Sequence, residues 1–149
     1  MKSETCFLFM IFGALSIDAQ VSVKSDSIGT KKSLADTLGN RTIQLFADGL
    51  SLAFKDTLTW GFDFKDFTPI EPMEIELTSN SIQIFHEINE HYTLERQVAM
   101  NDGTEGYCWF AKDYLGNSCR VYYYTDSKQS RCIAVEYHDA AWIYRIKAT

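Results

Sequence analysis

The chain has 149 residues, a length typical of one domain, and a formal net charge of −6 at pH 7. No basic cluster is longer than the pair Lys31 and Lys32. Nucleic acids and anionic membrane surfaces are bound by positively charged faces, so the sequence argues against both as partners.

Residues 1–19 have the pattern of a secretory signal peptide. Lys2 precedes an almost continuously apolar run over residues 6–15, and small residues follow it. A helix needs roughly 20 apolar residues to cross a bilayer, so this run is too short and stable membrane insertion is not expected. We expect cleavage after Ala19, with residues 14–16 as an alternative site, and a secreted or periplasmic mature protein.

Cysteine usage limits the contribution of disulfides. Cys6 would leave with the signal peptide, so the mature chain keeps Cys108, Cys119 and Cys132. An odd number allows at most one internal bridge, which excludes a disulfide-dense scaffold. The hydrophobic core must therefore supply most of the stability.

Residues 20–41 are rich in Ser, Thr, Lys and Asp and poor in apolar side chains, which indicates a short flexible leader. Within it, the sequence SLADTLG could form a helix of one or two turns, with Ser33 as the N-cap and Gly39 as the stop. The all-β domain is expected over residues 42–149.

Two hairpins are expected at the start of this domain. Asp48 and Gly49 lie between two alternating apolar segments and predict a two-residue turn. A three-residue loop at residues 55–57 would form the next hairpin and place Leu58 opposite Phe54. The inward pairs expected for the first hairpin are Ala47 with Leu50, Leu45 with Leu52, and Ile43 with Phe54.

Three later hairpins are predicted by the same agreement between loop length and apolar alternation. Their loops are at residues 78–81, 113–117 and 127–129, and Gly116 would close the second in the left-handed region. A final strand at residues 141–146 places Trp142, Tyr144 and Ile146 on one side. The aligned pairs are Leu77 with Ile82, Ile75 with Ile84, Ala111 with Cys119, Trp109 with Val121, Tyr107 with Tyr123, Tyr123 with Ile133, and Val121 with Val135.

These segments predict an all-β fold, a single antiparallel meander of about eight to ten strands. An open sheet of that length would leave two unpaired edges and an uncovered apolar face. We therefore expect the meander to close into a small barrel, with a two-sheet sandwich as the alternative.

The sequence HEINEH at residues 86–91 raises the question of a metal site. A zinc protease site needs two histidines four residues apart on a helix, with a glutamate after the first. His86 and His91 are five apart, which separates them by roughly 140° on a helix and puts them on opposite faces of a strand. His138 has no spacing that completes a site, so neither a metal nor another cofactor is expected.

The register of the same hairpin gives candidate ligand-binding residues. A three-residue loop at residues 89–91 would place His86 opposite Leu94 and Arg96 opposite Ile84, both facing the core. An inward cation and a titratable ring are costly unless they are satisfied, and a bound anion would satisfy them. The alternatives are a different register, a pair at the barrel rim, or a core pair satisfied by a carboxylate from a neighbouring strand.

Aromatic residues are concentrated in the last third of the chain. Trp109 and Tyr123 share the inward stripe and complete the candidate ligand-binding residues. Phe110, Tyr122 and Tyr124 lie on the opposite face and would form an exposed strip suited to a sugar ring or a protein partner. The alternative is ordinary packing between strands.

The same registers place the cysteines. Cys119 faces inward, whereas Cys108 and Cys132 face outward on strands about 10 Å apart, which is too far for a disulfide. We therefore expect three unbridged cysteines, with the outer two accessible to thiol reagents.

Nucleophilic catalysis has little support, because no Gly-x-Ser-x-Gly elbow is present and Cys108 has no histidine nearby in the sequence. The sequence favours a non-catalytic secreted or periplasmic β-domain that binds a small molecule or a glycan. The alternative is a protein-interaction module, such as an inhibitor or an envelope assembly component.

Overall fold

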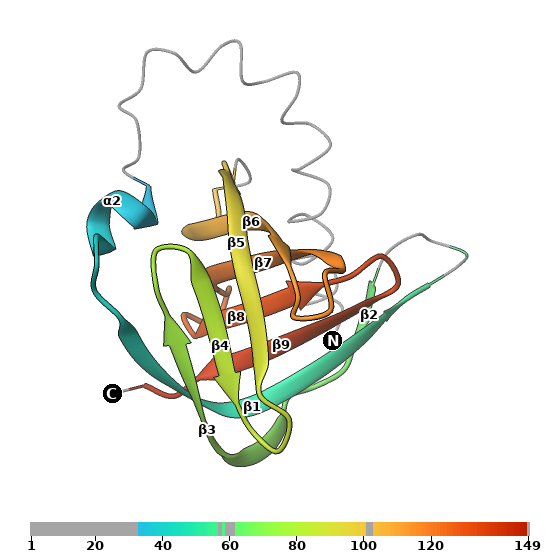
Figure 1. The fold of residues 1–149 in the computed structure, drawn as a ribbon. Coiled ribbons are helices and arrows are strands. Elements are labelled where there is room, and N and C mark those ends of the chain that lie inside the picture. The colour runs from blue at the N-terminus through green and yellow to red at the C-terminus, as the bar shows by residue number, and fades with distance from the viewer. Residues whose placement is uncertain (1–32, 57, 59–61, 101–102, 149) are drawn as a thin grey trace.

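The computed structural model describes residues 33–56, 58, 62–100 and 103–148. In these residues an antiparallel meander closes into an eight-stranded barrel with one extra strand, β2, which confirms the predicted all-β barrel (Figure 1). The elements are α2 (Leu34–Leu38), β1 (Ile43–Lys55), β2 (Phe62–Phe64), β3 (Thr68–Leu77), β4 (Ser81–Phe85), β5 (Glu90–Val98), β6 (Gly106–Lys112), β7 (Ser118–Thr125), β8 (Arg131–Glu136) and β9 (Ala140–Ile146).

Strand β1 closes the barrel. Its first part pairs with β3 and its second part with β9, and the register with both neighbours shifts between Ala47 and Gly49. Against β9, Asp48 is the extra residue of a β-bulge, whereas against β3 the additional unpaired residues lie on β3, between Pro69 and Met73. The irregularity bends the strand and lets it pair with both neighbours at the seam. Arg145 on β9 donates from Nε to Oδ1 of Asp48 at 3.0 Å, across that seam.

The hairpin predicted at Asp48 and Gly49 is therefore wrong. Apolar alternation on both sides of this pair fits a continuous bulged strand as well as a hairpin, and the distant pairing with β9 selects the strand. The next predicted register is also wrong. Phe54 lies opposite Asp63, and Leu58 lies exposed in the connection before β2.

The three later hairpins have the predicted registers. Gly116 has φ of 84°, in the left-handed region that its turn requires. In the same turn, Asp113 Oδ1 accepts hydrogen bonds from the backbone N–H groups of Leu115 and Asn117. Local turn chemistry therefore fixes this register. The confirmed pairs include Leu77 with Ile82, Ala111 with Cys119, and Val121 with Val135.

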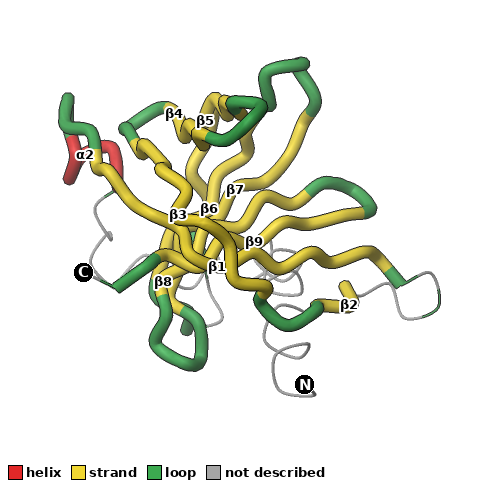
Figure 2. Tube along the Cα trace, turned by 90° about the horizontal axis from the view of Figure 1, so that it is seen from below, coloured by secondary structure: helices red, strands yellow, loops and turns green. Residues whose placement is uncertain are grey.

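Helix α2 lies at one edge of the strands in Figures 1 and 2 and packs on the barrel interior. Ser33 Oγ accepts the N–H of Asp36 at 3.0 Å, and Gly39 ends the helix at φ of 54°. The helix predicted here is confirmed. Leu34 and Leu38, one turn apart, are buried in the core, so part of the expected leader packs on the domain. No helix of the described residues has the length and apolar character needed to span a membrane.

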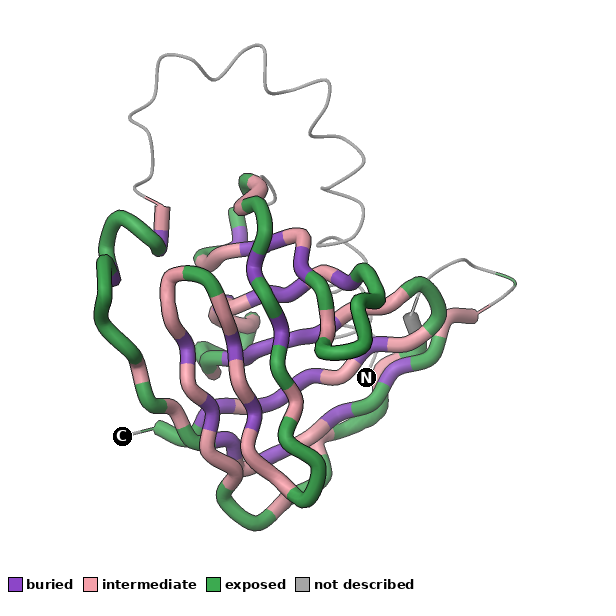
Figure 3. The backbone as a smooth tube through the Cα atoms, viewed as in Figure 1, coloured by how far each residue is buried: buried purple, intermediate pink, exposed green. Residues whose placement is uncertain are grey.

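Figure 3 shows the buried positions along the strands. On β8 four consecutive residues are buried, so the buried residues form an interior cluster and a second cluster on the outer wall. The outer cluster lies mainly on β6, β7 and β8, and the side chains of Phe64, Phe67, Val98 and Met100 cover it. Among the interior residues are Ile75, Leu77, Ile82, Ile84, Trp109, Val121, Ile133, Val135, Tyr144 and Ile146.

The cysteines lie on the predicted faces. Cys119 is inside the barrel, and Cys108 and Cys132 are in the outer cluster with β7 between their strands. No disulfide joins cysteines of the described residues. The expected accessibility of the outer two is wrong, because the covered wall leaves both 0% exposed. Burial also raises the pKa of Cys132 to about 12, which disfavours the reactive thiolate.

Candidate functional site

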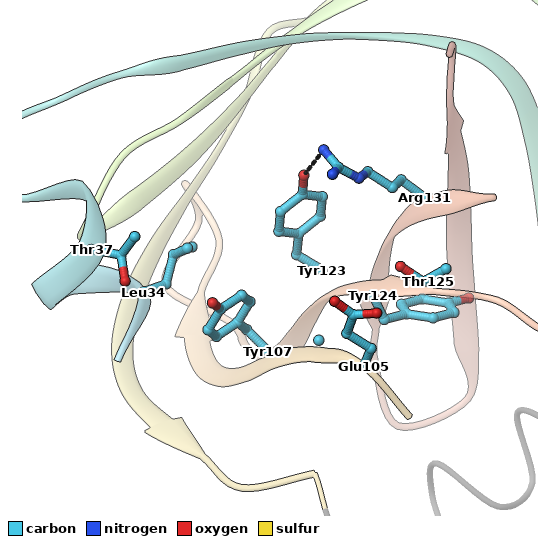
Figure 4. Close-up of a pocket in the computed structure, with 9 residues that line it drawn as sticks. Leu34, Thr37, Glu105, Tyr107, Tyr123, Tyr124, Thr125 and Arg131 are labelled. Carbon is cyan, nitrogen blue, oxygen red and sulfur yellow. Dashed lines mark hydrogen bonds between the residues drawn. The ribbon is translucent and has the colours of Figure 1, made fainter. Parts of the chain in front are cut away.

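A pocket of about 440 Å³ lies at the barrel mouth, the end at which helix α2 packs (Figure 4). Strands β6, β7 and β8 contribute one side of it, and α2 contributes the other. Side chains that line the pocket include Leu34, Thr37, Glu105, Tyr107, Tyr123 and Arg131.

Two tyrosines give the pocket its aromatic wall. Tyr107 and Tyr123 lie opposite each other on β6 and β7, where these strands reach the mouth. Tyr107 stacks on Trp109, with ring centroids 5.9 Å apart and an interplanar angle of 19°. Trp109 is 4% exposed, so it supports the pocket from the core below.

Gly106 allows the close approach of backbone at this wall. A Cβ at this position would collide with the backbone of Tyr123 and Tyr124. Only glycine therefore fits here without a shift of β6 against β7, and the placement of Tyr107 depends on it.

Arg131 supplies a positive charge at the rim. Its Nη1 lies 3.5 Å from the hydroxyl of Tyr123, as the dashed line in Figure 4 shows. Within the described part of the chain, no carboxylate forms an ion pair with this guanidinium. A guanidinium that has no ion-pair partner in the described residues can bind an acidic ligand group through two parallel hydrogen bonds.

Helix α2 is fastened to the barrel beside the pocket. The N–H of Leu34 donates to Oε1 of Gln97 on β5 at 3.1 Å. The first N–H groups of a helix have no partner inside the helix, so the glutamine side chain satisfies a group that would otherwise need water. This bond holds Leu34 and Thr37 against the pocket.

The structure brings together only part of the predicted ligand-binding set. Tyr123 lines the mouth pocket and Trp109 lies beneath it. The register that placed Arg96 opposite Ile84 is wrong, because Ile84 lies opposite Glu90. The connection between β4 and β5 includes His86, and neither His86 nor Arg96 reaches the pocket.

His86 belongs to a hydrogen-bonded network at the barrel end opposite the mouth. Its Nε2 lies 3.1 Å from Oε1 of Glu90, and the Tyr92 hydroxyl donates to Oε2 of the same carboxylate at 2.5 Å. Burial raises the pKa of Tyr92, which keeps its hydroxyl protonated and able to donate. A carboxylate of the protein thus contacts this histidine, but His86 does not form the core pair with Arg96 that the sequence alternative held.

Arg96 lies on the outer wall, with its Cζ 4.8 Å from the centroid of the Phe110 ring. The exposed aromatic strip predicted on this wall is wrong. Tyr122 and Tyr124 are 1% and 4% exposed, because other side chains cover the outer cluster. Of the three aromatic residues only Phe110 is half-buried rather than buried, and the guanidinium of Arg120 also lies over its ring, at 5.4 Å.

The two histidines of the HEINEH segment do not converge on one point. His86 contacts Glu90, whereas His91 is exposed and lies opposite Gln83 in the ladder. Among the described residues, no group of three or more His, Cys, Asp and Glu side chains could hold a metal ion.

Sequence reasoning missed Arg131, Glu105 and α2 as parts of the pocket. The strand pattern could have predicted Arg131, because this residue is two positions before Ile133 and therefore faces the same, inward side of the strand. No sequence pattern placed Glu105 or the helix at the pocket, because the mouth is formed by segments that are remote from one another in the chain.

The geometry defines a class of protein, a closed up-and-down barrel with a ligand-sized pocket at one end. No protein-family model matches the sequence, and no curated protein or solved structure matches it. The site alone therefore carries the functional conclusion.

Proposed function

We propose that this protein binds a small molecule, or the end of a glycan, in the mouth pocket. The observation that supports this is a pocket of about 440 Å³ with two tyrosine rings on its wall and Arg131 at its rim. Sites for small molecules commonly have volumes of several hundred Å³, apolar walls and a few polar groups that orient the ligand.

The lining favours a ligand that has both a flat apolar or sugar ring and an acidic group. Tyr107 and Tyr123 offer ring faces and hydroxyls, which suit such a ring. Arg131 suits a carboxylate, a sulfate or a phosphate. Secretion or a periplasmic location is part of the same proposal and rests on the signal pattern, which lies outside the described residues.

Fragment screening by NMR on the mature chain tests this proposal. We expect aromatic carboxylates and sugar acids to shift the resonances of Tyr107 and Tyr123. Tyr123→Ala and Arg131→Gln should each weaken binding about tenfold, the loss expected for a stacking surface or a charge-assisted hydrogen bond.

The matched control is Tyr114→Ala, which removes an exposed tyrosine from the β6–β7 turn at the other end of the barrel. Its ligand affinities should equal those of the unmodified protein. A screen whose ligands all shift residues outside the mouth pocket would overturn the proposal.

A second candidate function is contact with a protein partner. Three connections at the barrel end opposite α2 expose large apolar side chains, and such clusters are typical of interaction surfaces. These residues are Leu58, Ile88, Tyr114 and Leu115. Sedimentation velocity on the protein and on the variant with Ile88→Ser and Leu115→Ser tests self-association through this end. A monomer at all concentrations would argue against a second copy as the partner.

A further inference from the structure

A row of charged and aromatic side chains crosses the outer wall at the end of the barrel remote from the mouth pocket. Backbone pairing places Arg96 opposite Phe110, Phe110 opposite Arg120, and Arg120 opposite Glu136, on strands β5 to β8. Residues directly opposite one another share a face, so the four side chains form one continuous row.

A groove of about 360 Å³ lies at the part of this row that runs from Phe110 to Glu136, toward the β8–β9 connection. Its volume is sufficient for a small organic anion. Side chains from β1, β6, β7, β8 and the β8–β9 connection meet there, and they include a lysine, an arginine, a histidine and a carboxylate. The lining includes Lys55, Phe110, Ser118, Arg120, Glu136 and His138.

Arg120 is held in the groove by a ring instead of a carboxylate. Its Cζ lies 5.4 Å from the Phe110 centroid, and in the described residues no carboxylate lies within ion-pair distance of it. A guanidinium stacked on a ring keeps its N–H edges available for hydrogen bonds. Those edges can meet the oxygens of an anion.

Glu136 does not cancel the positive charge around it. Its Oε2 accepts a hydrogen bond from the Tyr122 hydroxyl at 2.7 Å. Burial raises the pKa of Glu136 to about 7, although the hydrogen bond from Tyr122 and the charges of Arg120 and Lys55 oppose the shift. Near neutral pH this carboxyl group is therefore only partly ionised, so it offsets only part of the charge of Arg120.

We infer that this groove is a second binding site, which takes a small organic oxyanion such as a carboxylate or a phosphate ester. Arg120 and Lys55 supply the positive charge, and the Ser118 hydroxyl lies within the same groove as a further donor.

Three sugars with the same hexose ring test this inference on the mature chain by NMR titration. Glucuronate carries a carboxylate, glucose 6-phosphate carries a phosphate, and glucose is neutral. We expect at least one of the two acids to shift the resonances of Phe110 and Arg120, and glucose to leave them unchanged. The acid that binds identifies the kind of oxyanion, and binding of both shows a general oxyanion site.

Arg120→Gln should weaken binding of the acid about tenfold or more, and Lys55→Gln should weaken it in the same direction. Lys55→Gln, at the end of β1, provides a second test if Arg120→Gln disturbs the fold. Arg131→Gln, in the mouth pocket, is the matched control and should leave these shifts intact, which separates this site from the proposed function. Equal affinity in both groove variants, equal binding of glucose, or no shift with either acid would overturn the inference.

Discussion

Two glutamates of this barrel are each anchored by a tyrosine hydroxyl, and their surroundings differ. Glu90 accepts from Tyr92 at 2.5 Å and lies 3.1 Å from His86. Glu136 accepts from Tyr122 at 2.7 Å and faces the cations of the outer groove. Burial raises the pKa of both tyrosines, so each remains a hydrogen-bond donor. The carboxylates thus keep a hydrogen bond in places where water is partly excluded.

The raised pKa of Glu136 predicts how stability depends on pH. Between its unfolded value, near 4.5, and about 7 the folded protein holds a proton that the unfolded chain has released. Stability from this group is therefore complete below pH 4.5 and is lost as the pH rises through 7. We expect a loss of roughly 2 kcal/mol, less than the full shift implies because the residue keeps some contact with water.

Urea denaturation between pH 5 and 8 measures this loss, and Glu136→Gln should remove it. The amide oxygen of glutamine can still accept the Tyr122 hydroxyl and carries no charge, so this variant should be the more stable one at pH 8. Glu105→Gln, which alters an exposed carboxylate, is the control and should keep the slope of the unmodified protein. An unchanged slope in Glu136→Gln would show that another group is responsible.

At the scale of the elements, residues that specify a turn separate what the sequence predicts from what it does not. The aspartate and Gly116 of the turn at Asp113 to Asn117 specify its geometry, so the paired strands follow. The β4–β5 connection is one residue longer than the loop assumed for it and lies at other positions. Ile84 therefore meets Glu90 instead of Arg96. Such a shift keeps a plausible apolar pattern, so the pattern alone cannot exclude it.

The candidate site follows the same division. Trp109 and Tyr123 were predicted to face inward because the turn with Asp113 and Gly116 fixes their hairpin, and both do. The cover over the outer cluster includes Phe64 and Phe67, which are remote in sequence from β6 to β8, so the outer wall looked exposed from the strand pattern. Contacts between distant segments depend on barrel closure, which no local signal encodes.

The bulge in β1 predicts a difference between two variants. Deletion of Asp48 would remove the residue that is extra against β9 and force a one-residue slip, which turns the inward side chains of one strand segment outward. We expect that variant to lose cooperative unfolding. Asp48→Ala keeps the bulge and loses only the bond to Arg145, a half-exposed pair, so it should cost less than about 1 kcal/mol. Equal stability of the two variants in urea would show that the bulge does not set the register.

At the scale of the whole molecule, the two ends and two faces of the barrel wall are chemically different. The mouth end has α2, the tyrosine wall and Arg131, whereas the opposite end has the Glu90 network and apolar connections. The outer groove lies at that opposite end, where Phe110, Arg120 and Glu136 of the outer face contribute to its lining. An occupant of one site therefore leaves the other accessible, and the two proposed ligands should bind independently.

The last prediction concerns closure of the barrel by β9, which pairs with both β1 and β8. Removal of residues 140–149 would leave those two strands with unpaired edges and open the apolar interior to water. Exposed edges of this kind pair with other chains, so we expect the truncated protein to form large oligomers in sedimentation velocity. Removal of residues 147–149 alone takes away, among the described residues, the backbone bond from Lys147 to Phe46 and should leave the sedimentation coefficient unchanged. A truncated protein without β9 that sedimented as a folded monomer would mean that the β1–β9 seam is dispensable for the fold.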